Sequence, residues 1–318
     1  MMQSVEQNKR ETVWTIREIL NWTTKRFANS GIDTPLLDAQ LLLSHVLNLP
    51  KVQLYIQIDK PLNEIERKKY RDLVTKRLQG VPVAYLLQKK YWHELELFVD
   101  ERVLIPRPET ETMLDIVLQF LKLKNIFPTL IYDFCTGSGC LAIALARKYP
   151  NAKVIAIDIS EDALKVAKIN AEQNKVSNVK FLQLDLNIEE NYLYLQKEFG
   201  CAEVIISNPP YVTFEEWENL DISVKNYEPK LALVSEDMGL KIGKNITNFT
   251  KKYNLLKSSE YIFTMELAHD QPEKVLEKNI KSYSSNHSPW SFPKEQYFSL
   301  CDLEDKNRFL VSLNYTEN

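Results

Sequence analysis

The chain has 318 residues, of which 44% are hydrophobic and 26% charged, and its formal net charge is −3. The length suffices for two domains or for one large domain with an appendage, and the composition is ordinary for a soluble globular protein. There is no basic excess of the kind typical of general nucleic-acid binders, and no apolar run approaches the about 20 residues of a membrane span.

The N-terminal segment MMQSVEQNKRETVW lacks an apolar core and carries acidic residues. It is therefore predicted to be neither a secretory signal nor a transit peptide. The four cysteines form no CxxC pair, and the four histidines show no metal-ligand spacing, so no metal site is expected. Scattered cysteines without a signal sequence indicate a reducing, cytoplasmic setting. The cysteines are Cys135, Cys140, Cys201 and Cys301.

Residues 13–79 are predicted to form three to five helices. The segment TPLLDAQLLLSHVLNL begins with a plausible N-cap, Thr34, and has Pro35 at the first helical position. The segment NEIERKKYRDLVTKRLQ reads as a second amphipathic helix, ended by Gly80 and Pro82. Both a plain helical bundle and a partner-docking module remain open. One apolar face of the first helix is predicted to comprise Leu36, Ala39, Leu43 and Val46.

Residues 83–105 change character. The stretch YLLQKKYWHELELFVDERVLI alternates apolar and polar residues and is rich in aromatics, which predicts a β-hairpin. The sequence PRPETE at 106–111 then predicts a rigid loop that leads into a helix.

From residue 130 onward, strand patterns alternate with helical patterns, which predicts a parallel sheet with helices on both faces. The strands read as continuous apolar runs, as buried parallel strands do. The last two candidates are predicted to be adjacent and antiparallel. The predicted strands are Leu130–Phe134, Val154–Asp158, Val179–Asp185, Val204–Ser207, Tyr261–Leu267, Tyr297–Leu303 and Phe309–Tyr315.

The first of these strands runs into DFCTGSGCLAIALA, where Gly137 and Gly139 lie between a strand and a helix. Small residues there let backbone amides approach a ligand at the helix N-terminus. Asp158 ends the next strand, and its separation in sequence from the glycine turn is typical of an acid that binds a ribose. The third strand is predicted to end at Asp185. These features predict an adenosine-containing ligand. GSGCLA also satisfies a dinucleotide fingerprint, so a nicotinamide-dependent oxidoreductase remains a rival.

The fourth strand ends in IISNPPYV. The side chain of Asn208 and the backbone of Pro209 each offer a carbonyl acceptor, and together they can bind both hydrogens of a planar NH2 group. Tyr211 adds a flat face for a planar target. Hydride transfer has no need of paired acceptors, whereas methylation of an amide or an exocyclic amine does. The tetrapeptide therefore predicts a methyltransferase acting on such a nitrogen.

The chain resembles the HemK/PrmC family across nearly its whole length. The resemblance rests on DAQLLLSHVL, GVPVAYLLQKKYWHELELFV, VLIPRPETE, DFCTGSGCLAIALA, SNPPYV and YEPKLALVSEDMGL. It implies an α/β class I (Rossmann-like) S-adenosylmethionine-dependent methyltransferase with a seven-stranded, mostly parallel sheet. It also implies transfer of a methyl group to the side-chain amide nitrogen (N5) of the glutamine in the GGQ motif of peptide chain release factors.

The resemblance assigns roles by position. The cofactor would contact the glycine turn, the ribose-binding acid, the third strand end and the catalytic asparagine. The family's first turn glycine is replaced here by a cysteine, whose Cβ avoids crowding only at negative φ. The implied cofactor-binding residues are Cys135, Thr136, Gly137, Ser138, Gly139, Asp158, Asp185, Leu186 and Asn208. The implied catalytic residues are Asn208, Pro209, Pro210 and Tyr211.

The implied organisation is a helical docking domain at 1–82, a hairpin connector at 83–105 and a catalytic domain at 106–318. The expected protein is a cytoplasmic monomer that meets release factors but no membrane and no nucleic acid. Four alternatives remain open. One is an amine methyltransferase for nucleic-acid bases, which shares NPPY. Another is a methyltransferase for a ribosomal-protein glutamine, which usually has a different tripeptide after the arginine. The others are a non-catalytic binding module and an NAD-dependent enzyme, which leaves NPPY unexplained.

Overall fold

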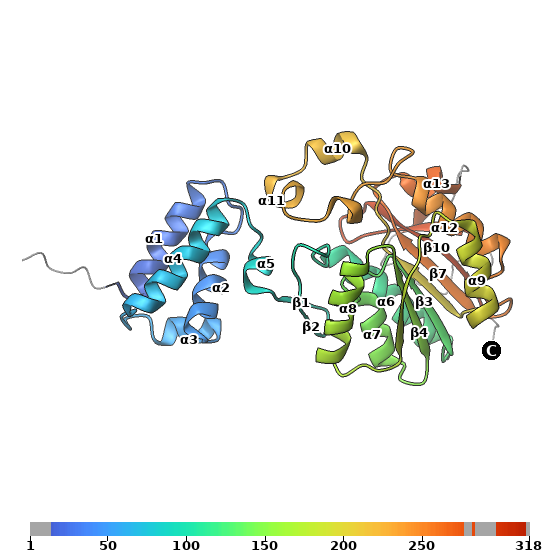
Figure 1. The fold of residues 1–318 in the computed structure, drawn as a ribbon, viewed down its shortest axis with the longest axis horizontal. Coiled ribbons are helices and arrows are strands. Elements are labelled where there is room, and N and C mark those ends of the chain that lie inside the picture. Colours follow the sequence, from blue (N-terminus) through green and yellow to red (C-terminus); the bar gives the residue numbers. More distant parts are fainter. Residues whose placement is uncertain (1–13, 277–281, 284–296, 316–318) are drawn as a thin grey trace, which may run out of the picture. The chain divides into compact units, whose positions relative to one another are not determined.

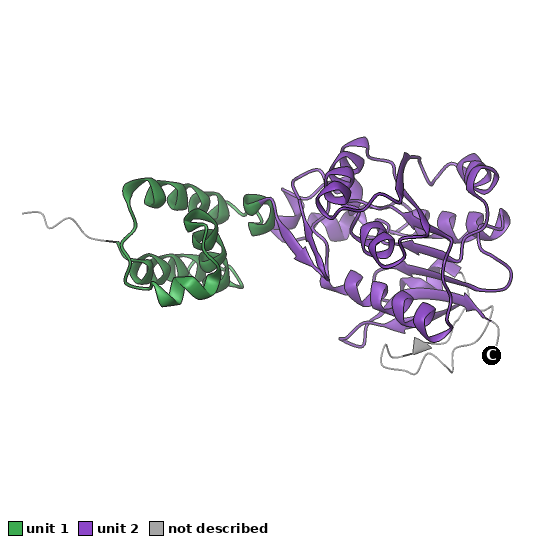
Figure 2. Ribbon diagram, turned by 90° about the horizontal axis from the view of Figure 1, so that it is seen from below, with its two compact units in different colours: residues 1–87 green, residues 88–318 purple. Residues whose placement is uncertain are grey.

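The computed structural model describes residues 14–276, 282–283 and 297–315. The chain divides into two compact units, residues 1–87 and 88–318, coloured green and purple in Figure 2. The division into 1–82, 83–105 and 106–318 stays a prediction, and so does the absence of a leader, which lies outside the described residues. No helix in the described ranges is long and apolar enough to cross a membrane.

Unit 1 is a bundle of helices. Capping boxes at Thr15 and Asn63 fix the starts of α1 and α4, because each cap side chain and the glutamate three residues later bond each other's backbone amide. Apolar residues of α1, α2 and α4 then form one core. The helices are α1 Ile16–Ala28, α2 Pro35–Leu47, α3 Lys51–Ile56, α4 Glu64–Leu78 and α5 Val83–Leu87.

The predicted apolar face of α2 is partly wrong. Leu36 is 48% exposed, whereas Leu42, which the prediction left out, is fully buried beside Leu43. The reason is that α2 packs against both α1 and α4, so its buried surface is wider than a single stripe. Thr34 does occupy the N-cap, but its hydroxyl donates to the Asp38 carboxylate at 2.8 Å instead of capping the backbone.

The predicted hairpin at 83–105 is shorter than expected. Its first residues form α5, whose first turn is closed by bonds from the Tyr85 and Leu86 amides to the Pro82 carbonyl. The hairpin itself consists of β1, Lys90–Trp92, and β2, Leu95–Leu97. The indole N–H of Trp92 donates to the Arg107 carbonyl at 2.9 Å, which ties the hairpin to the PRPETE loop.

The sheet of unit 2 has the order β5-β4-β3-β6-β7-β10-β9-β8, and Figure 1 labels its strands β3, β4, β7 and β10. The five strands from β5 to β7 are parallel, and β10 is antiparallel to both β7 and β9. The predicted mostly parallel class I sheet is confirmed, with the two-residue β8 as an eighth strand beside the seven expected. The strands are β3 Leu130–Phe134, β4 Lys153–Asp158, β5 Val179–Gln183, β6 Val204–Ser207, β7 Tyr261–Glu266, β8 Ser282–Tyr283, β9 Tyr297–Cys301 and β10 Asn307–Asn314.

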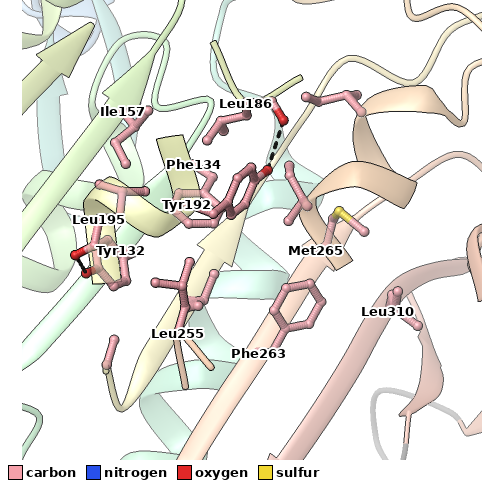
Figure 3. Close-up of a cluster of buried hydrophobic side chains, with 14 of the residues drawn as sticks. Tyr132, Phe134, Ile157, Leu186, Tyr192, Leu195, Leu255, Phe263, Met265 and Leu310 are labelled. Atoms are coloured by element: carbon pink, nitrogen blue, oxygen red, sulfur yellow. Dashed lines mark hydrogen bonds between the residues drawn. The ribbon is translucent and has the colours of Figure 1, made fainter. Parts of the chain in front are cut away.

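Helices cover both faces of this sheet. On one face, side chains of α9, α12 and α13 pack with Tyr132, Phe134 and Phe263 in the apolar cluster of Figure 3. Asp133, between the first two, points to the other face, where it accepts a bond from the α7 amide of Ala142. The helices are α6 Pro108–Leu123, α7 Cys140–Lys148, α8 Glu161–Gln173, α9 Glu189–Phe199, α10 Phe214–Glu218, α11 Ile222–Lys225, α12 Lys241–Lys252 and α13 Gln271–Leu276. A 3-10 turn spans Lys230–Ala232.

The third parallel strand ends earlier than predicted. It stops at Gln183, so Asp185 lies in the following loop rather than at the strand end. There its carboxylate accepts bonds from the backbone and side-chain nitrogens of Asn187, at 2.8 and 3.0 Å. The bond from the Asn187 amide closes a local turn after the strand.

Candidate active site

A cavity of about 280 Å³ opens at the carboxyl ends of the parallel strands. The strand order reverses between β3 and β6, and open α/β sheets bind ligands at such a switch point. Among the residues that the structure describes, those that line the cavity all belong to unit 2. They come from within six stretches of the chain, 102–110, 135–141, 158–163, 184–187, 208–210 and 229–242.

The turn after β3 contributes a glycine with an open face. Gly137 lies at φ +53°, and a Cβ built on it would meet no atom within 4 Å, so the position faces open space. Its amide donates to Asp158 Oδ2 at 2.9 Å, which links the turn to the end of β4. Thr136 donates to the buried carboxylate of Asp133 at 2.5 Å, and burial raises the pKa of Asp133 to about 7.

Gly139 and Ser138 serve the packing of this turn. Gly139 is the N-cap of α7 at φ +82° and does not line the cavity. A Cβ there would come within 3.0 Å of the Ala167 Cβ, so the missing side chain lets α8 approach α7. Ser138 is buried at the cavity wall, and its carbonyl accepts from Asn170 Nδ2 at 2.9 Å.

Cys135 takes the left-handed conformation that favours glycine. Its φ is +59°, so the condition of negative φ under which a cysteine fits without crowding is not met. Cys135 is a lining residue of the cavity, and burial raises the pKa of its thiol well above its usual range, which keeps the thiol protonated. Gln88 is likewise left-handed at φ +51°. Both positions thus retain a glycine-type backbone without glycine.

Asp158 is half-buried at the cavity wall, with both oxygens held by backbone amides. Oδ2 accepts from Gly137 and Oδ1 accepts from Ser160, each at 2.9 Å. A carboxylate has about four lone-pair positions, so each oxygen retains one for a further donor. Burial raises the pKa of Asp158, and the two amide bonds act against that shift. A pair of vicinal ribose hydroxyls fits this set of acceptors.

The wall beyond β5 is mainly apolar. Leu186 is buried and its carbonyl accepts from the Tyr192 hydroxyl at 3.0 Å, as Figure 3 shows. Together with Leu184 and Ile242 it gives the cavity an apolar side next to the carboxylate of Asp185. A flat aromatic base packs well on such a surface, with polar atoms at its edge. The residues present therefore fit an adenosine group that carries a charged side chain toward the glycine turn.

The tetrapeptide after β6 splits between the cavity and the core. Asn208 and Pro210 line the cavity, whereas Pro209 and Tyr211 do not. Asn208 Nδ2 donates to Thr110 Oγ1 at 3.0 Å. The Tyr211 hydroxyl donates inward to Glu266 Oε1 at 3.3 Å, and the Tyr211 carbonyl accepts from Gln271 Nε2 at 2.9 Å. The role of the tyrosine ring as a face for the target stays a prediction.

Sequence reasoning missed the buried carboxylates that bind residues 105–110. Arg107 of PRPETE pairs with the buried carboxylate of Glu228 at 2.6 Å, and the Ile105 amide donates to the same carboxylate at 3.1 Å. Thr110, three residues further on, donates to Glu266 Oε2 at 2.8 Å. PRPETE and YEP stood out in the sequence as motifs, but their partners lie more than 100 residues away. Only the folded chain could show the pairing.

Comparison with known proteins gives similarity over both units. Residues 18–87 match the PrmC N-terminal domain, and residues 129–299 match a methyltransferase domain. The chain is 42% identical over 229 residues to the release factor glutamine methyltransferase of Chlorobaculum tepidum, covering 71% of this chain and 77% of the relative. It is 36% identical over 247 residues to that of Rhodopirellula baltica, covering 76% and 81%. Among solved structures, the hMettl16 catalytic domain bound to MAT2A 3'UTR hairpin 6 aligns over 78% of this chain and 83% of that chain, at 16% identity and a TM-score of 0.48.

Proposed function

Because the chain belongs to the release factor glutamine methyltransferase family, we propose that it methylates the glutamine side chain of peptide chain release factors. The methyl donor is S-adenosylmethionine, and the acceptor is the amide nitrogen N5 of the glutamine in the GGQ motif. The observation that carries this proposal is the position of Asn208. Its carboxamide lines the same cavity as the open face of Gly137 and the carboxylate of Asp158.

The cofactor is proposed to lie along this cavity. Thr136, Gly137 and Ser138 would border its methionine part, Asp158 would accept from its ribose hydroxyls, and Leu186 would pack on its adenine. When bound, S-adenosylmethionine supplies a methyl group made electrophilic by the sulfonium charge. The protonated thiol of Cys135 adds no charge to this end of the cavity.

The side chain of Asn208, which lines the cavity, and the backbone carbonyl of the adjacent Pro209, a residue that does not itself line it, are proposed to bind the glutamine amide. An amide nitrogen is a poor nucleophile because its lone pair is delocalised into the carbonyl. Two carbonyl acceptors that bind its two hydrogens stabilise the pyramidal nitrogen of the transition state and direct its lone pair at the methyl group. The nitrogen becomes acidic as it is alkylated, so the reaction needs no strong general base.

The test is transfer of radiolabel from S-adenosylmethionine to a purified release factor, beside a release factor whose GGQ glutamine is substituted. Label is expected on the first protein only. Asn208→Ala is expected to lower turnover about 100- to 1000-fold, as loss of one preorganised hydrogen-bonding group does, with nearly unchanged cofactor binding. Asn174→Ala, outside the cavity, serves as the matched control. Equal label on the substituted release factor would point to another target.

Unit 1 is proposed to dock the release factor. Several large apolar side chains of α3 remain exposed, with Val52 at 62% and Ile56 at 68%. Val52 and Ile56 are four residues apart and so lie on one face of the helix, and an exposed apolar face is typical of a protein-binding site. Ile56→Asp is expected to raise KM for the release factor with little change in kcat, and an unchanged KM would remove α3 from the docking surface.

We also propose that the protein acts in the cytoplasm as a monomer and binds no nucleic acid. Sedimentation with and without RNA would test the monomeric state and the absence of RNA binding.

A further inference from the structure

A chain of three hydrogen bonds runs from the candidate catalytic asparagine into the core. Asn208 Nδ2 donates to Thr110 Oγ1 at 3.0 Å, and Thr110 Oγ1 donates to Glu266 Oε2 at 2.8 Å. The other oxygen of Glu266 accepts from the Tyr211 hydroxyl at 3.3 Å. Thr110 and Glu266 are both buried, at 2% and 1% exposed. The network therefore joins α6, β7 and the loop after β6 beneath the cavity.

The bonding capacity of each group fixes the direction of the whole chain. A hydroxyl has one proton to donate, and an ionised carboxylate can only accept. With Glu266 ionised, the proton of Thr110 goes to Glu266, so the hydroxyl can only accept from Asn208. The amide of Asn208 must then turn its NH2 group toward Thr110. Its oxygen is the polar atom left to face a molecule in the cavity.

We propose that Thr110 and Glu266 are positioning residues that orient the Asn208 carboxamide so that it presents its oxygen, and not its nitrogen, to the substrate amide. This inference rests on the proposed function, because only an NH2 substrate requires an oxygen at that place. A carboxamide can rotate by 180° about its last torsion with little change in shape, so packing alone does not select the oxygen-out state. The hydroxyl of Thr110 selects it through the charge on Glu266.

Protonation of Glu266 reverses the selection. The neutral acid donates its proton to Thr110, the hydroxyl of Thr110 then donates to Asn208 Oδ1, and the amide turns its NH2 group toward the cavity. There it meets the NH2 group of the substrate, donor against donor. Burial raises the pKa of Glu266 to about 7, so its ionised and protonated forms are both populated near neutral pH.

The charged and titratable groups around Glu266 bear on this protonation. Thr110 and Tyr211 lower the pKa of Glu266 through their hydrogen bonds, and Arg308 of β10 lowers it through its charge. Glu109 of α6 raises it. Cys140 of α7 also senses the carboxylate, but burial keeps this thiol protonated by raising its pKa to about 12. Tyr211 is held protonated by burial, which raises the pKa of its hydroxyl, so it remains a donor throughout.

The first test compares Thr110→Val with Thr110→Ser. Valine keeps the shape and removes the hydroxyl, whereas serine keeps the hydroxyl. Thr110→Val is expected to lower kcat about tenfold, the effect of one hydrogen bond, with the Kd for S-adenosylmethionine within about twofold of wild type. Thr110→Ser is expected to retain activity. Thr247→Val is the matched control, because Thr247 is equally buried but bonds only its own helix, at Gly243.

An unchanged kcat in Thr110→Val would overturn the proposal. An equal loss in Thr110→Ser would also overturn it, because the methyl group rather than the hydroxyl would then matter. Wild-type transfer to the release factor is measured alongside. If wild type labels no release factor, the proposed function fails, whereas an active wild type with an indifferent Thr110→Val defeats only the positioning role.

The second test uses pH and decides the case even if Thr110→Val does not fold. In wild type, kcat is expected to rise about tenfold between about pH 6 and pH 8, as Glu266 ionises. Glu266→Gln cannot ionise, so its kcat is expected to be flat over this range. The substrate amide itself does not titrate there. A wild-type rise that persists in Glu266→Gln, or no rise in wild type, would overturn the proposal.

Discussion

Gly239 lies against the backbone of Tyr211 in the NPPY tetrapeptide, and we expect its replacement by alanine to damage both stability and rate. Its φ is +80°, and a Cβ there would come within 2.2 Å of the Tyr211 carbonyl oxygen and 2.8 Å of Gln271 Nε2. The left-handed backbone alone costs about 1 to 2 kcal/mol for a non-glycine residue. Relief of the overlap requires Tyr211 to move by about 1 Å, and such overpacking typically costs about 1 to 3 kcal/mol more.

Gly239→Ala is therefore expected to lose about 2 to 5 kcal/mol of unfolding free energy. Its methyl-transfer rate is expected to fall about 100-fold, because a displacement of about 1 Å in a catalytic group has that effect. Gly200→Ala is the control, since Gly200 also has positive φ but open space around its Cβ. Urea unfolding and single-turnover labelling measure the two effects. If Gly239→Ala transferred methyl groups as fast as Gly200→Ala, the contact with Tyr211 would not position the tetrapeptide.

Three further predictions concern single side chains. Asp158→Asn retains one of the two acceptor oxygens that bind the amides of Gly137 and Ser160. Calorimetry is expected to show that this variant binds S-adenosylmethionine at least about tenfold more weakly than wild type. An unaltered affinity would refute the assignment of Asp158 to the ribose. Thr264 Oγ1 is buried without a hydrogen-bond partner among the described residues, so Thr264→Val is expected to raise the unfolding free energy by about 1 kcal/mol, and a loss of stability would reveal a partner for the hydroxyl. Burial raises the pKa of Glu266 in the folded protein to about 7. The contribution of protonated Glu266 to the free energy of unfolding is therefore fully present below the pKa of this residue in the unfolded chain, and it is lost as the pH rises to about 7. The stability advantage of Glu266→Gln over wild type is accordingly expected to grow by about 3 kcal/mol between about pH 4.5 and pH 7, and a difference that stays constant would show that Glu266 does not titrate in this range.

Sequence patterns located the parallel strands well because burial on both faces makes them continuous apolar runs. β3 and β6 were predicted to the residue, at Leu130–Phe134 and Val204–Ser207. The end of β5 was predicted less well. The strand stops at Gln183, and Asp185 instead forms a local bond to the Asn187 amide, which no periodicity reports. The exposed Leu36 likewise reflects which neighbours α2 has, which its own spacing cannot specify.

The chain order of the glycine turn, the acid at Asp158 and the NPPY tetrapeptide was enough to predict the class of enzyme. These features are local, because each follows one strand, and parallel strands bring their carboxyl ends to one edge. The orientation of Asn208 was not predictable in this way. It depends on the Thr110 hydroxyl, 98 residues before Asn208 in the chain, and on the Glu266 carboxylate, 156 residues after Thr110. Hydrogen bonds between such distant groups form only when the sheet and α6 have packed together, so the tertiary structure alone decides how the Asn208 carboxamide is oriented.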